Sequence, residues 1–126
     1  MPNITVKLLE ELGACQDGID WLEDNFPDGT TLDNAIKSGL HPHYTDVSWF
    51  ISRCKFCQTE IALDFYKSIN PSFQDVGWLI NHCKFCQTVK MAKYYKNLNP
   101  YDADIEWMIR TFEFRKRPEI IKILEG

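Results

Sequence analysis

The sequence predicts an all-α fold in which about four helical hairpins form a short stack, or solenoid. Three residue types recur at intervals of 29 positions, a length that suits one helical hairpin. Apolar residues within each interval are spaced three or four apart, as on one face of a helix, and no stretch alternates apolar and polar residues as a strand would. A hairpin this short cannot bury its own apolar face, so its neighbours must supply the core. The recurring residues are Pro42, Pro71 and Pro100; Asp46, Asp75 and Asp104; and Trp49, Trp78 and Trp107.

The first two predicted elements are a leader helix and a diverged hairpin. The leader helix covers residues 5–12, and the hairpin covers residues 13–41. This hairpin has an aromatic residue followed by an apolar one, Trp21 and Leu22, and then Phe26. The Trp21 position is shifted by one residue from the 29-residue spacing of the later repeats. Terminal repeats of a stack are commonly atypical, because one of their faces has no neighbour.

The next two hairpins, residues 42–70 and 71–99, are nearly identical at their centres. Ser72 and Asp75 resemble a capping arrangement at the start of a first helix. Thr59 and Thr88 are suited to cap the second helix of each hairpin. Each hairpin closes at an Asn-Pro pair, because a residue before proline avoids the helical conformation. The shared segments are Arg53-Cys54-Lys55-Phe56-Cys57-Gln58-Thr59 and His82-Cys83-Lys84-Phe85-Cys86-Gln87-Thr88, and the closing pairs are Asn70-Pro71 and Asn99-Pro100.

A fourth repeat, residues 100–126, completes a predicted single domain of residues 1–126. Phe112, Phe114 and Arg115 continue the 29-residue spacing of the earlier repeats. Pro118 falls in the first turn of the last helix, where proline is tolerated. The end repeats could also stack on those of a second copy, which would give a symmetric homodimer.

Composition and charge are those of a globular protein without a membrane segment. Hydrophobic residues make up 44% of the 126 residues and charged residues 25%. No apolar run approaches the roughly 18 residues of a membrane span, and no signal-peptide pattern opens the chain, so we expect a cytoplasmic protein with no membrane partner. Residues 1–35 carry eight acidic groups against one base, and the remainder carries thirteen bases against ten acids. With a pI near 5.3, this pattern disfavours nucleic-acid binding over the whole surface.

The four cysteines of the two central hairpins allow two interpretations. Two Cys-x-x-Cys pairs, Cys54 with Cys57 and Cys83 with Cys86, are a common ligand set for structural zinc. However, Cys54 and Cys83 align with Phe112, and a position that accepts phenylalanine is a packing position, where a free cysteine acts as a small hydrophobe. Equivalent positions on stacked helices also lie about 8–10 Å apart, too far for ligands of one ion. We therefore expect no cofactor, with zinc on these four cysteines as the alternative.

Two further chemical interpretations of this region are weaker. A redox-active Cys-x-x-Cys pair belongs at a helix N-terminus after a strand, whereas each pair here follows an apolar helix. The histidines could complete a mixed metal site, but each lies beside a turn or on a polar helix flank, so we expect them on the surface. They are His41, His43 and His82.

A strip of basic and aromatic residues in the last two repeats is the candidate partner-binding surface. Such a strip suits an acidic protein partner, and it could also contact phosphates while tyrosines stack on bases. The alternative is that the basic groups only solvate a helix whose tyrosine belongs to the core. The strip consists of Lys90, Lys93, Tyr94, Lys96, Arg115, Lys116 and Arg117.

The opening segment resembles the leader of many small uncharacterised phage and prophage proteins. The resemblance rests on Ile4-Thr5-Val6-Lys7-Leu8-Leu9-Glu10-Glu11-Leu12-Gly13-Ala14-Cys15, followed by Gly18 and Trp21, within the first 35 residues. It implies a phage-encoded protein that acts in the bacterial host cytoplasm as a stoichiometric inhibitor of host defence, as anti-CRISPR proteins do. It carries over no functional residues.

No catalytic constellation is recognisable in the sequence. Ser/His/Asp triads, glycine-rich phosphate loops and metalloprotease signatures are all absent. We therefore expect a non-catalytic protein-binding module, with a bacterial host protein or defence complex as its partner. The alternative function is a zinc-stabilised regulator that binds nucleic acid.

Overall fold

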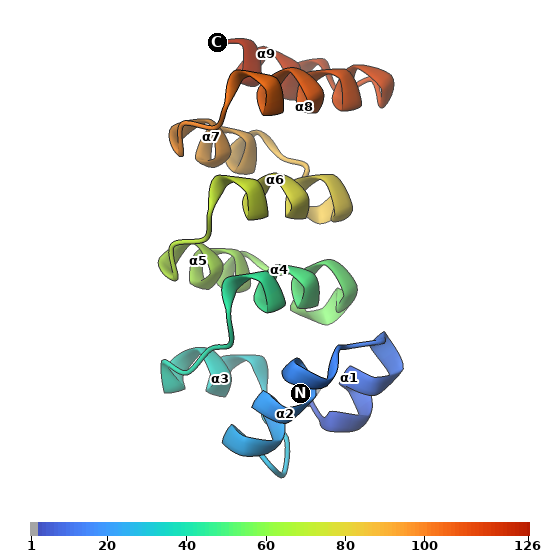
Figure 1. The fold of residues 1–126 in the computed structure, drawn as a ribbon, viewed down its shortest axis with the longest axis vertical. Helices are drawn as coiled ribbons and strands as arrows, with labels where there is room; N and C mark the ends of the chain where they lie inside the picture. The colour runs from blue at the N-terminus through green and yellow to red at the C-terminus, as the bar shows by residue number, and fades with distance from the viewer. Residues whose placement is uncertain (1–2) are drawn as a thin grey trace. The chain divides into compact units, whose positions relative to one another are not determined.

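The structure is a computed structural model that describes residues 3–126, and it confirms the all-α fold class (Figure 1). Residues 3–126 form nine α-helices and two short 3₁₀ turns, with no strand. Ile4 and Thr30 form an isolated antiparallel bridge. None of the helices in this range is long and apolar enough to cross a membrane.

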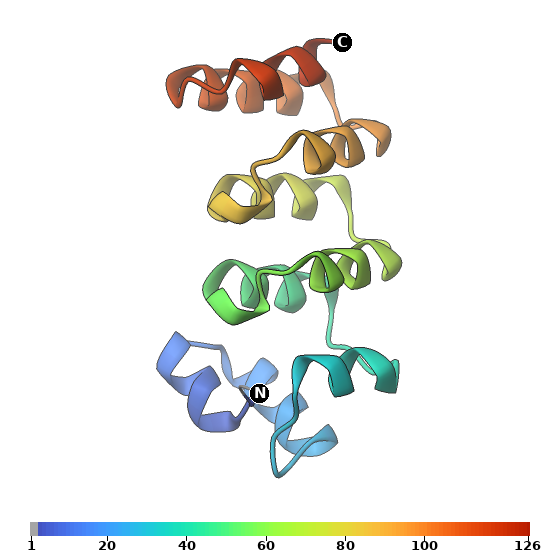
Figure 2. The ribbon, with the colours of Figure 1, turned by 180° about the vertical axis from the view of Figure 1, so that it is seen from behind.

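The chain divides into two compact parts, with the boundary between Asn70 and Pro71. This boundary coincides with the Asn-Pro junction at which one predicted hairpin ends and the next begins. We call residues up to Asn70 the N-terminal part and residues from Pro71 the C-terminal part. They are coloured blue to green and yellow to red, respectively, in Figure 2.

The described residues of the N-terminal part form five α-helices and one 3₁₀ turn. Helix α1 packs on α2, α3 packs on α5, and α4 packs on α5. The elements are α1 (Val6–Leu12), α2 (Gln16–Asn25), α3 (Leu32–Ser38), α4 (Tyr44–Arg53), η1 (Lys55–Cys57) and α5 (Glu60–Ser68).

The start of the described chain is tied to the loop between α2 and α3. The amide of Ile4 donates to the carbonyl of Thr30 at 2.6 Å, and the Thr30 amide donates back at 2.9 Å. Gly29 has a left-handed φ of +84°, and a Cβ at this position would lie 2.9 Å from the Ile4 carbonyl oxygen. Only glycine allows this close approach without strain.

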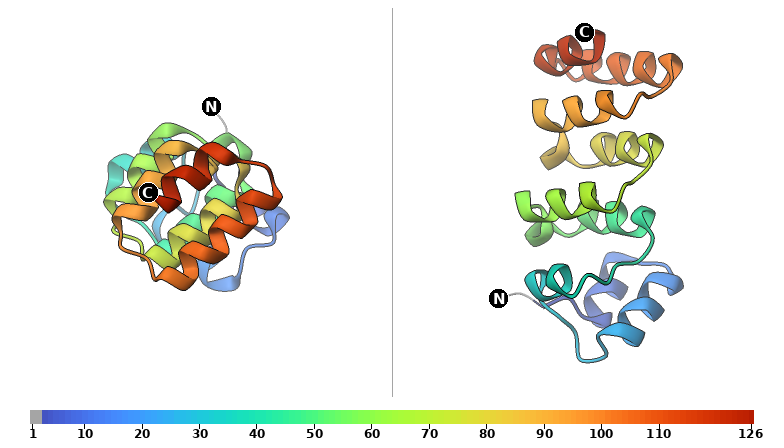
Figure 3. Two further views of the ribbon diagram at one scale, coloured as in Figure 1. Left: turned by 90° about the horizontal axis from the view of Figure 1, so that it is seen from above. Right: turned by 90° about the vertical axis from the view of Figure 1, so that its left-hand side faces the viewer.

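The C-terminal part contains four α-helices and one 3₁₀ turn. Helix α9 packs on both α7 and α8, and α6 packs on α7; Figure 3 shows α8 and α9 side by side in orange and red. The elements are α6 (Phe73–His82), η2 (Lys84–Cys86), α7 (Val89–Asn97), α8 (Asp102–Phe114) and α9 (Pro118–Glu125).

The predicted helix caps are present. Thr59, Ser72 and Thr88 each accept a hydrogen bond of 3.2 Å from an amide three residues further on, and Pro118 occupies the first turn of α9. Asn70 and Asn99 have φ values of 56° and 58°. Both residues thus leave the helix through the left-handed region, which asparagine tolerates better than most residues.

Candidate functional site

The outer face of α8 carries two exposed large apolar side chains, and one of them, Phe114, is the most exposed of this kind among the described residues. Phe114 is 88% exposed and Trp107 is 56% exposed. They lie seven residues apart, which is two helical turns, and so they share one face of the helix. Met108 and Phe112 are fully buried and fix the opposite, inward face. We call Trp107 and Phe114 the α8 aromatic pair.

Other aromatic residues of the C-terminal part are also accessible. Tyr101, the N-cap residue of α8, is 65% exposed, and its ring meets the ring of Phe73 edge-on at 5.0 Å. On α6 the exposed Trp78 stacks on His82 with ring centroids 4.4 Å apart. His82 Nδ1 donates to the Trp78 carbonyl at 2.8 Å. The C-terminal part therefore presents aromatic surface on two helices.

Sequence reasoning did not identify the α8 aromatic pair as a surface feature. In the sequence, Trp107 and Phe114 only indicate the 29-residue repeat spacing. A sequence signal existed, because Met108 and Phe112 are spaced i and i+4 and so define an inward face that excludes positions 107 and 114.

The predicted basic strip separates into exposed side chains and side chains that hold the fold. Lys90, Lys93 and Lys116 are exposed, and Tyr94 is half-buried, which raises its pKa. Lys96 donates a hydrogen bond to the Leu124 carbonyl of α9.

Both arginines of the strip bind main-chain carbonyls on either side of η2. A terminal nitrogen of Arg115 donates to the Asn81 carbonyl at 3.3 Å, and its guanidinium lies 5.8 Å from the centre of the Phe112 ring. Arg117 donates to the Gln87 carbonyl at 2.6 Å and pairs with Glu119 at 2.9 Å. These contacts tie the turn between α8 and α9 to η2, so both arginines serve the fold.

The two Cys-x-x-Cys pairs are buried. In each pair the first cysteine directly precedes a 3₁₀ turn and the second is its last residue. The Sγ atoms of Cys54 and Cys57 lie 3.1 Å apart. The hydrogen bond from the Cys57 thiol lowers the pKa of Cys54, and the same bond together with burial raises the pKa of Cys57. The corresponding bond from Cys86 lowers the pKa of Cys83 to about 7.

The described residues contain no group of three or more His, Cys, Asp or Glu side chains arranged to hold a metal ion. Cys54 and Cys57 belong to the N-terminal part, and Cys83 and Cys86 to the C-terminal part. Cys54, Cys83 and their aligned residue Phe112 are all buried core residues. This is the burial that the packing interpretation of these positions requires.

The three histidines are exposed, and each makes a local hydrogen bond, that of His82 being the bond to Trp78 described above. His43 Nδ1 accepts a hydrogen bond from the Thr45 amide at 3.2 Å and so caps α4, while His41 Nδ1 donates to the Pro42 carbonyl at 2.8 Å.

Comparison with known proteins identifies no relative: no family model, curated protein or solved structure matches this chain.

Proposed function

We propose that this chain is a non-catalytic protein-binding module that docks through the outer face of α8. The observation that carries the proposal is the α8 aromatic pair, Trp107 and Phe114, exposed on one face of a helix whose other face is fixed in the core. Burying apolar surface of this kind against a partner is favourable, and tryptophan is enriched among the residues that dominate binding energy.

The surroundings of the pair fit a protein interface. Large aromatic side chains bury about 150–250 Å² each, so two of them can form the apolar centre of a docking patch. Asp102, Glu106, Arg110 and Glu113 are exposed on the same helix and provide charges of both signs. An apolar centre within a polar rim is the usual anatomy of such an interface.

The basic strip has a supporting role in this proposal. Lys90, Lys93 and Lys116 are exposed and would steer an acidic partner during encounter. Lys96, Arg115 and Arg117 instead hold α9 and η2 through main-chain carbonyls. Charge reversal of the arginines would therefore disturb folding as well as binding.

The partner class rests on the resemblance of the first 35 residues to phage leaders. That resemblance makes a bacterial defence protein or complex the first partner to test, with inhibition by occupation of its surface. Inhibition of this kind requires affinity and stoichiometry and no chemistry on the inhibitor.

The test is an affinity pull-down from nuclease-treated bacterial lysate with three forms of the chain. They are the wild type, the double variant Trp107→Ser/Phe114→Ser, and the control Ile61→Ser, which removes an apolar side chain that is 57% exposed in the N-terminal part. We expect one stoichiometric protein to bind the wild type and the control, and to be lost from the double variant. Equal capture by all three forms would refute docking through α8. Recovery of nucleic acid alone, from lysate without nuclease, would refute the protein-binding function.

A further inference from the structure

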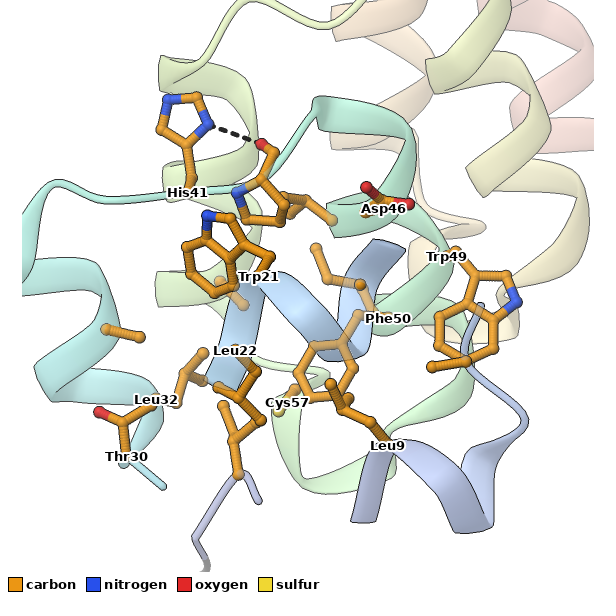
Figure 4. Close-up of a pocket in the computed structure, with 18 of the residues that line it drawn as sticks. Leu9, Trp21, Leu22, Thr30, Leu32, His41, Asp46, Trp49, Phe50 and Cys57 are labelled. Atoms are coloured by element: carbon orange, nitrogen blue, oxygen red, sulfur yellow. Dashed lines mark hydrogen bonds between the residues drawn. The ribbon is translucent and has the colours of Figure 1, made fainter. Parts of the chain in front are cut away.

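A pocket of about 320 Å³ lies within the N-terminal part (Figure 4). Every helix from α1 to α5 contributes to its wall, and η1 contributes Cys57. In Figure 4, Leu9, Leu22, Phe50 and Cys57 lie close together, and Trp21 lies beside them. The volume falls within the range of about 300–1,000 Å³ that is typical of small-molecule sites. All of its lining residues belong to the N-terminal part, so a ligand bound there would be independent of the function proposed above.

The pocket exists because several positions of its wall carry little or no side chain. Gly18 lies on the inward face of α2, one turn before the buried Leu22. A Cβ at Gly18 would find no heavy atom within 4 Å, so the space beside it is open. The other small wall residues are Gly13, Ala14, Ala35 and Ala62.

The chemistry of the wall selects against an anionic ligand. Few polar side chains line the pocket. The described lining includes one carboxylate, Asp46, and one imidazole, His41, which donates a hydrogen bond to the Pro42 carbonyl (Figure 4). No lysine or arginine is found among the described residues that line the pocket. A ligand carboxylate, phosphate or sulfonate would therefore be desolvated without a cationic partner, which is costly. The remaining wall is mainly aliphatic and aromatic, with the rings of Trp21, Trp49 and Phe50.

We propose that this pocket binds a neutral, largely aromatic small molecule. The indole and phenyl rings of the wall offer faces and edges for stacking, which adds to the gain from burying the ligand's apolar surface. The walls come from helices on several sides of the space, which suits a compact molecule. The occupant is thus a small ligand of this chemistry.

The experiment uses N-phenyl-1-naphthylamine, a neutral aromatic probe whose fluorescence rises in apolar surroundings. Titrated into the intact chain, it should bind saturably at one site. Gly18→Leu extends a side chain into the open space and should weaken binding by about tenfold or more, since pockets discriminate strongly on a few buried carbons. Gly18→Ala is the matched control, because it makes the same glycine replacement and leaves most of the volume open.

The charge preference is tested with 8-anilino-1-naphthalenesulfonate, which has the same ring system plus a sulfonate. We expect it to bind at least about tenfold more weakly than the neutral probe, and Asp46→Asn should narrow the gap. Circular dichroism and thermal unfolding verify that each variant is folded. Phe114→Ser, on α8, should leave binding of the neutral probe unchanged.

Two results would overturn the proposal. The first is equal affinity of the neutral probe for Gly18→Leu and Gly18→Ala, or binding that does not saturate, since either would place the probe on the outer surface. The second is equal or tighter binding of the sulfonate probe, which would refute a neutral ligand.

Discussion

The two parts of the molecule bury their apolar residues to different degrees. In the described N-terminal part, ten apolar residues are buried, and Ile4, Leu9 and Val47 each remain 7–8% exposed. The shorter C-terminal part buries twelve, each to 2% exposure or less. The N-terminal part, whose core residues are less completely buried, holds the pocket. The C-terminal part, whose core residues are almost fully buried, exposes aromatic side chains at its surface.

The difference has an identifiable structural cause. The C-terminal part is closed by long-range contacts, in which Arg115, Arg117 and Lys96 bind carbonyls 28 to 34 residues away. The N-terminal part is closed by the backbone bridge between Ile4 and Thr30, and its helices α1 and α3 have only seven residues each. Short helices with small inward residues leave volume unfilled.

Truncation of one phenylalanine in each part is the strongest test of this contrast. Phe112→Ala removes a fully buried ring from the closed core, and we expect it to lower the free energy of unfolding by about 3–5 kcal/mol. Phe50→Ala removes a half-buried ring that borders the pocket, and should cost about 1–2 kcal/mol, because less apolar area is lost. Urea denaturation measures both. Equal losses would show that the two interiors are packed alike.

Two glycines of the N-terminal part test how much the backbone bridge between Ile4 and Thr30 contributes to stability. Gly13 and Gly29 both have φ of +84°, but only a Cβ at Gly29 meets a neighbour, the Ile4 carbonyl oxygen at 2.9 Å. Gly13→Ala should cost about 1 kcal/mol of stability for the left-handed backbone alone. Gly29→Ala should cost about 2–3 kcal/mol, because the bridge to Ile4 must also shift. Thermal unfolding of both variants measures the difference, and identical midpoints would mean that the bridge contributes nothing.

The smallest expected effect at neutral pH concerns the thiol pair of the C-terminal part, because only a fraction of its contribution to stability is present near pH 7. The Cys86 thiol holds the pKa of Cys83 at about 7, below its ordinary value of 9.0. Because the pKa is lowered in the folded state, this contribution to stability is fully present above about pH 9 and is lost as the pH falls through about 7. Ultraviolet absorbance of the thiolate should follow this titration, and Cys86→Ala should move it to higher pH. The control Cys57→Ala removes the bond to Cys54 and should leave the Cys83 titration in place. A titration unchanged by Cys86→Ala would contradict the assignment.

Much of the fold follows from local sequence signals. The all-α class and the caps at Thr59, Ser72 and Thr88 depend on residues within one helical turn, where spacing alone is informative. The roles of Arg115 and Arg117 depend on carbonyls about thirty residues away, and a basic run by itself does not reveal such partners.

The candidate site was less accessible to sequence reasoning for the same reason. Trp107 and Met108 are adjacent and both apolar, and the tertiary packing of α8 decides which one is buried: Met108 reaches Gly77 of α6, whereas Trp107 stays exposed. The pocket beside Gly18 is an absence of side chains, and a scattered glycine in a helix gives no indication of what surrounds it.

The long-range contacts of the C-terminal part also set an order for folding during synthesis. Both partners of the bridge between Ile4 and Thr30 are synthesised early, and all described elements of the N-terminal part have been made once Asn70 has emerged from the ribosome. The C-terminal part, in contrast, must wait for α9, because Lys96 binds the carbonyl of Leu124 and the buried Ile120 and Leu124 complete its core. Since domains generally fold as units and N-terminal ones first, the nascent chain should hold the formed N-terminal pocket before α8, with its exposed aromatic side chains, is in place.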